Sequence, residues 1–108
     1  MIYRIVFEDN EDIEDYGHID FYLKEITSPI KLEVGDKIVL SGASFDRVTF
    51  YDLRDDDIDE MMEFLIKNSI RESKHLAYFE ISDIVYNHEW YNNEAEYNFH
   101  GIIILRGK

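Results

Sequence analysis

Apolar residues between positions 58 and 66 recur at the spacing of a helix that is apolar along one side only. They fall at positions i, i+3, i+4, i+7 and i+8, and are Ile58, Met61, Met62, Leu65 and Ile66. Asp55 to Asp57 stand just before them, where carboxylates can accept hydrogen bonds from free backbone N–H groups and interact favourably with the helix dipole. The pattern predicts an amphipathic helix over about residues 56–70, whose apolar side must be buried against the rest of the fold.

The rest of the chain has the patterns of β-strands and turns. Residues 1–7 alternate loosely between apolar and polar side chains, and Ile19, Phe21 and Leu23 repeat with the period of two that is typical of a half-buried strand. The acidic stretch between these two segments is expected to be a loop. Four more strands are predicted, at 38–40 and 48–53 before the helix and at 76–86 and 97–105 after it.

This order of strands and one helix predicts an α+β fold. We expect an antiparallel, strongly bent sheet or a small β-barrel of about six strands, with the helix packed on one face or end. The last two strands are expected to form a closing hairpin. The chain has 108 residues and a single proline, and no stretch resembles a linker, so a single domain over residues 1–108 is predicted.

Acidic residues outnumber basic ones by 24 to 11, which gives a formal net charge of −13. A first cluster without any base occupies residues 8–15, and a second occupies residues 52–63. Proteins that bind phosphates rely on Lys and Arg, so this balance argues against direct binding to nucleic acid or to an anionic membrane. The same charges would attract a basic protein, which is the partner that we predict.

Sequence motifs for catalysis and metal binding are not found. There is no glycine-rich phosphate loop, no nucleophile elbow and no zinc-protease motif, and neither acidic cluster has the spacing of a calcium loop. The histidines, His18, His75, His88 and His100, lie far apart, and His100 is expected to be an ordinary residue of the last strand. No catalytic residue, metal ligand or cofactor is therefore predicted, and the protein is not expected to be an enzyme.

Three absences in the sequence bear on where in the cell the protein is located. The opening residues lack the apolar run of a signal peptide, and the longest aliphatic run, Ile102–Leu105, is too short to span a bilayer. The chain has no cysteine, which excludes disulfides and fits a reducing compartment. We therefore expect a cytoplasmic protein that does not enter a membrane.

The single tryptophan stands next to a tyrosine in a segment rich in asparagine, residues 86–93. Trp and Tyr are common anchors of protein interfaces, although these two could instead pack back on the core or decorate the end of a hairpin. We predict a partner-binding surface that combines the two aromatic residues with the first acidic cluster. Its residues are Asp9, Glu11, Asp12, Glu14, Asp15, Trp90 and Tyr91.

Two classes of function fit these observations. The first is a non-catalytic acidic domain that occupies a basic, nucleic-acid-binding partner, as inhibitors and immunity proteins do, in one form by imitating a nucleic acid. The alternative is a small ligand-binding or enzymatic β-barrel whose pocket gathers groups that are distant in the sequence. Acids arrayed along one face would favour the first class, and a concave pocket with convergent polar groups and shifted pKa values would favour the second.

Overall fold

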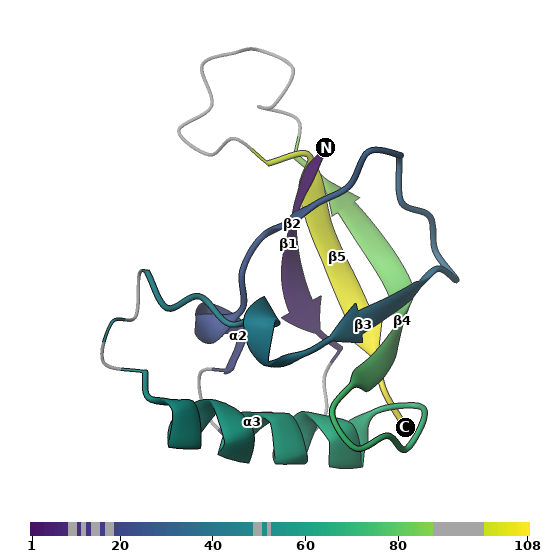
Figure 1. Cartoon of the computed structure of the whole chain (residues 1–108). Coiled ribbons are helices and arrows are strands. Elements are labelled where there is room, and N and C mark those ends of the chain that lie inside the picture. The colour runs from purple at the N-terminus through teal and green to yellow at the C-terminus, as the bar shows by residue number, and fades with distance from the viewer. Residues whose placement is uncertain are drawn as a thin grey trace.

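The computed structural model describes residues 1–8, 11, 13, 16, 19–48, 51, 53–87 and 99–108. The elements follow in the order β1 (Ile2–Phe7), α2 (Ile19–Tyr22), β2 (Ile26–Thr27), β3 (Lys37–Leu40), the 3-10 helix η1 (Gly42–Ser44), α3 (Asp55–Asn68), β4 (Ala77–Tyr86) and β5 (Gly101–Arg106). In Figure 1 the strands form a curved sheet, and α3 lies across one end of it. The predicted α+β class with one main helix is confirmed.

The five strands of the described residues form one mixed sheet, in the order β2-β1-β5-β4-β3, which curves into a half-barrel. β4 and β5 form the predicted antiparallel pair, but β5 is parallel to β1. This corrects the expectation of a fully antiparallel sheet with about six strands. The first and last strands can lie side by side in parallel because the chain between them supplies the long crossover that a parallel pair requires.

The segment after the acidic stretch is a short helix, α2, and not the predicted strand. Ile19 and Leu23, four residues apart, are both buried, which is the spacing of one helical turn. Phe21, which a strand would place on the same side as these two residues, is 61% exposed. The period of two in this segment therefore does not reflect a strand, because only two of its three apolar residues, Ile19 and Leu23, face the core.

The predicted strand over residues 48–53 is also not found, since none of its described residues lies in a strand. Val48 and Tyr51 would lie on opposite faces of a strand, yet they are 88% and 90% exposed. In the acidic stretch, where a loop is predicted, Glu11 and Ile13 have helical backbone, and Ile13 is buried. In both segments the described residues thus have helical or irregular backbone where the sequence predicted a strand or a loop.

The core lies between one face of the sheet and α3. Alternate residues of the three central strands point into it, namely Tyr3, Ile5, Phe7, Ala77, Phe79, Ile81, Ile103 and Leu105. The predicted stripe of α3 is confirmed: Ile58, Met62 and Leu65 are buried, and Met61 and Ile66 are partly buried against the same core. The opposite side of α3 is left to the solvent, and that side carries the acidic residues.

The start of α3 matches its predicted acidic first turn, which holds Asp55, Asp56 and Asp57. The carboxylate of Asp57 accepts a hydrogen bond of 3.0 Å from the backbone N–H of Arg54, the residue before the helix. Asp55 forms an ion pair of 2.7 Å with Arg47. The first turn is therefore held in place by its own side chains, which fixes the direction of Asp57.

Candidate functional site

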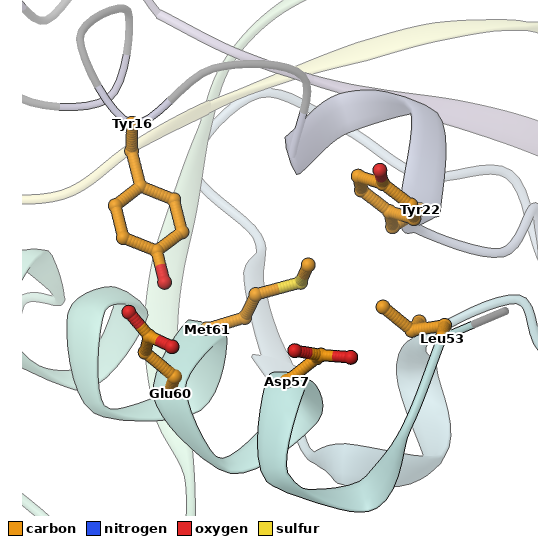
Figure 2. Close-up of a pocket in the computed structure, with 6 residues that line it drawn as sticks. All are labelled: Tyr16, Tyr22, Leu53, Asp57, Glu60 and Met61. Atoms are coloured by element: carbon orange, nitrogen blue, oxygen red, sulfur yellow. The ribbon is translucent and has the colours of Figure 1, made fainter.

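A pocket of about 240 Å³ lies between α2 and the N-terminal half of α3. It is lined by Tyr16, Tyr22, Leu53, Asp57, Glu60 and Met61. Figure 2 shows the two tyrosines on the side opposite α3, with the side chains of Asp57, Glu60 and Met61 rising from the helix toward them. The pocket thus joins two aromatic residues, two carboxylates and a thioether from segments that are distant in the sequence.

The helix places three of these side chains together. Asp57, Glu60 and Met61 stand at positions i, i+3 and i+4, which lie on one side of an α-helix. This side borders the buried stripe, so Met61 is partly buried while Glu60 remains exposed. Asp57 is partly buried like Met61, so Glu60 is the most exposed of the three side chains.

Tyr16 is held in position by its ring, which stacks on Phe64 with a centroid distance of 4.2 Å and an interplanar angle of 15°. The pKa of the Tyr16 phenol is raised, first by burial and then by the negative charges of Glu60, Asp57 and Glu63. Its hydroxyl stays protonated at neutral pH and can donate a hydrogen bond, but it is a poor base. Figure 2 shows this hydroxyl directed toward Glu60.

The solvent side of α3 is a continuous acidic surface next to this pocket. Its exposed acids are Asp55, Asp56, Asp59, Glu60 and Glu63. Asp55, Asp59 and Glu63 are successively four residues apart, and so are Asp56 and Glu60. The five acids therefore form two neighbouring rows, in each of which successive members lie about 6 Å apart along the helix axis. We call these five residues the acidic face of α3. It belongs to the second acidic cluster of the sequence, at residues 52–63.

Most of the predicted partner-binding residues are not described by the structure. Glu11 is described and exposed. The others, Asp9, Asp12, Glu14, Asp15, Trp90 and Tyr91, lie outside the described residues. The surface predicted from them therefore stays a prediction, and the acids that the structure brings together with aromatic residues are those of α3.

His100 was expected in the last strand, but it lies immediately before β5, which begins at Gly101. Its buried ring meets Tyr3 and Tyr86 edge-to-face, with centroid distances of 5.3 and 5.4 Å, and its backbone N–H donates to the carbonyl of Ile2. The pKa of His100 is lowered, first by burial and then by Lys31 and the N-terminal ammonium group. The neutral ring is thereby favoured, which suits a packed residue.

A second pocket, of about 360 Å³, lies near the C-terminal end of α3. It is lined by Glu63, Ile66, Lys67, Glu72, Ser73, Lys74 and Lys108. Its three lysines are mixed with two glutamates, so it does not select one sign of charge as the first pocket does. The first pocket is therefore the better candidate for a binding site.

Two features are absent from the described part of the chain. Within it, no group of three or more His, Asp or Glu side chains could hold a metal ion. No helix there combines the length and the apolar content needed to cross a membrane.

Sequence reasoning did not single out Tyr16 or Tyr22. Tyr22 lies in the segment predicted as a strand, where it falls on the polar side of the alternation, and Tyr16 follows a stretch expected to be a loop. The one usable signal is that Asp57, Glu60 and Met61 share a side of the predicted helix. Nothing local indicates that two tyrosines from before β2 would lie opposite that side.

The chemistry of the first pocket suits a positively charged group. Aromatic faces and carboxylates both attract cations. The pKa of Tyr16 is raised, which moves it further from the neutral range that acid–base catalysis needs. Comparison with protein-family models, with curated proteins and with solved structures finds no match to this chain.

Proposed function

We propose that the protein is a non-catalytic binding domain that occupies a basic protein partner through the acidic face of α3 and the pocket beside it. The observation that carries this proposal is the meeting of Tyr16 and Tyr22 with Asp57 and Glu60, at the edge of a row of exposed carboxylates. Charges steer a partner to a surface, and buried aromatic anchors hold it there. Both ingredients occur together at this place in the fold.

Three exposed apolar residues lie in segments that also supply residues of the pocket, and they would add contact area for a partner. Phe21 neighbours Tyr22 on α2, and Val48 and Tyr51 lie in the segment that leads to Leu53, and all three are exposed. Interfaces of proteins combine an apolar centre with a polar rim. These residues therefore support a protein partner over a small soluble ion.

The basic surface of a nucleic-acid-binding protein is the partner that fits the charges best. The net charge of −13 repels nucleic acid itself and attracts a surface that normally holds phosphates. Phosphates of one DNA strand follow one another about every 3.4 Å along the duplex axis. Each row of acids on α3 repeats about every 6 Å, so it is a sparser version of that array. We propose that the protein acts in the cytoplasm as an inhibitor or as an immunity-type protein. In the most specific version of this proposal, its acidic surface imitates a nucleic acid.

The proposal is tested by capture of partners from the source organism with two variants of equal charge. One variant replaces Asp56, Asp59 and Glu63 by amides. The control replaces Glu25, Glu33 and Asp83, which are exposed acids outside α3. Each variant loses three negative charges, so net charge alone cannot separate them.

We expect the wild type and the control to capture the same basic protein, and the α3 variant to bind it about tenfold more weakly. Three exposed ion pairs at about 0.5 kcal/mol each amount to about 1.5 kcal/mol, which is a factor of about ten. Raising the salt concentration from 0.1 to 1 M should weaken capture too, because the Debye length falls from about 10 to about 3 Å. Equal capture by both variants, or a captured protein that is not basic, would refute the proposal.

A further inference from the structure

We infer that the pocket between α2 and α3 receives a single arginine side chain of the partner, with its guanidinium group between Tyr22 and the carboxylates of Asp57 and Glu60. This inference rests on the proposed function, because it names the chemical group by which a basic partner is held. It turns a diffuse attraction between charged surfaces into one specific contact.

The size of the pocket suits one long side chain. Its volume of about 240 Å³ is below the roughly 300–1,000 Å³ of pockets that hold a whole small-molecule ligand, so it suits one side chain better than a folded segment. Leu53 and Met61 line the pocket with apolar surface, against which the methylene groups of arginine can pack. The carboxylates stand where the charged end of that side chain would lie.

Guanidinium matches the polar groups of the pocket better than ammonium does. It is planar, it carries five N–H donors in a fixed fork and it stacks on aromatic rings, whereas the lysine ammonium is compact and strongly hydrated. Two carboxylates one helical turn apart can each accept from a different edge of the fork. Tyr22, on the opposite side of the pocket in Figure 2, offers the ring for stacking.

The pocket is organised before any ligand arrives. Tyr16 is fixed by stacking on Phe64, and Asp57 is fixed by the hydrogen bond from the backbone N–H of Arg54. A carboxylate has about four acceptor positions, so Asp57 can accept from a ligand as well. Arg54 forms a long ion pair with Asp57, with 3.9 Å between Nε and the carboxylate oxygen, and the Arg54 side chain is 87% exposed.

The field in the pocket is negative, as the pKa of Tyr16 indicates. Glu60, Asp57 and Glu63 each raise this pKa, because they disfavour a second negative charge on the phenolate. The same charges favour a cation at the same place. Because these groups are already positioned, binding an arginine orders few side chains of this protein, which keeps its entropic cost low.

The methionines of the chain provide a direct readout. Met61 lines the pocket, Met62 is buried in the core, and Met1 is the first residue, and there are three in all. A ¹H–¹³C spectrum of protein labelled at its methionine methyl groups thus contains one probe of the pocket and two internal controls. The ligands are the end-blocked peptides Gly-Arg-Gly and Gly-Lys-Gly, titrated at constant ionic strength.

We expect Gly-Arg-Gly to shift the Met61 signal in a saturable way, with a Kd on the order of 1 mM, as suits one side chain, while Met62 and Met1 stay in place. Gly-Lys-Gly should bind at least about threefold more weakly, because ammonium is more strongly hydrated and lacks the planar fork. In Tyr22→Leu, which removes the ring and keeps an apolar side chain, this preference for arginine should disappear.

Two adjacent acids supply the matched control. Glu60 and Asp59 are both exposed on α3, but only Glu60 lines the pocket. Glu60→Gln should raise the Kd of Gly-Arg-Gly about fivefold, whereas Asp59→Asn, with the same loss of charge, should change it less than about twofold. An unchanged Met62 signal in each variant shows that the core is intact.

The arginine assignment is overturned if Met61 does not shift, if the lysine peptide binds as tightly as the arginine peptide, or if the two substitutions have equal effects. If partner capture then still depends on the acids of α3, the proposed function stands and the pocket assignment alone fails. If Gly-Arg-Gly binds as expected but capture does not depend on those acids, the proposed function fails and the pocket assignment stands.

Discussion

Phe79→Ala is expected to lower the free energy of unfolding by about 3–5 kcal/mol. Phe79 is fully buried in β4, pairs with Ile38 of β3 and meets the ring of Phe7 edge-to-face at a centroid distance of 5.1 Å. Truncation removes these contacts and leaves a cavity in the middle of the sheet. A strand paired on both sides cannot move inward to fill such a cavity, so most of the cost should appear.

The control for Phe79 is its neighbour Tyr78, which points to the opposite face of the sheet. Tyr78 is partly exposed, and its ring lies 5.1 Å from the guanidinium of Arg71. Tyr78→Ala should lower the free energy of unfolding by only about 1 kcal/mol. Urea titrations followed by circular dichroism measure both values. Equal losses of unfolding free energy in the two variants would contradict the fold, in which the face of the sheet that carries Phe79 is buried and the face that carries Tyr78 is not.

Leu65→Ala is expected to lower the free energy of unfolding by about 2–5 kcal/mol. Leu65 is fully buried at the centre of the stripe that joins α3 to the sheet. Asp59→Ala, on the solvent side of the same helix, should change stability by less than about 0.5 kcal/mol. The same urea titrations apply, and a loss below about 0.5 kcal/mol for Leu65→Ala would show that the stripe faces solvent.

The helix was predictable because all of its information is local. The apolar residues recur at helical spacing over three turns, and acids occupy the first turn, so propensity and pattern agree. β4 is long enough for its β character to stand out in the same way. α2 has only four residues, Ile19–Tyr22, and over so short a segment the period of a helix and that of a strand cannot be told apart until the exposure of Phe21 is known.

The order of the strands was not predictable, because it depends on contacts between distant parts of the chain. Alternation shows which residues of a strand share a face, but not which strand lies beside it. The pairing of Tyr3 with Gly101 joins the first strand to the last, and no feature of either segment indicates a parallel neighbour. A closing hairpin, by contrast, follows from two strands adjacent in the sequence, and it was predicted correctly.

The candidate site was predictable in part. The acidic face of α3 follows from the second acidic cluster once a helix is assigned there, because the stripe leaves the acids on the other side. The pocket could not be predicted from the sequence, since Tyr16 and Tyr22 lie in segments whose conformation differs from the sequence prediction. An aromatic anchor beside acidic residues was predicted at Trp90, which lies outside the described residues. Within the described residues, aromatic and acidic side chains meet at Tyr16, Tyr22, Asp57 and Glu60.

Hydrogen–deuterium exchange of the protein, alone and with its captured partner, tests binding on the acidic face of α3 most directly. The first backbone N–H groups of a helix have no partner within it, so the amides of Asp55 to Asp57 exchange readily and report on any surface that covers them. We predict slower exchange in the first turns of α3 and in α2 when the partner is bound. Slower exchange confined to β3, with α3 unchanged, would contradict binding at this face.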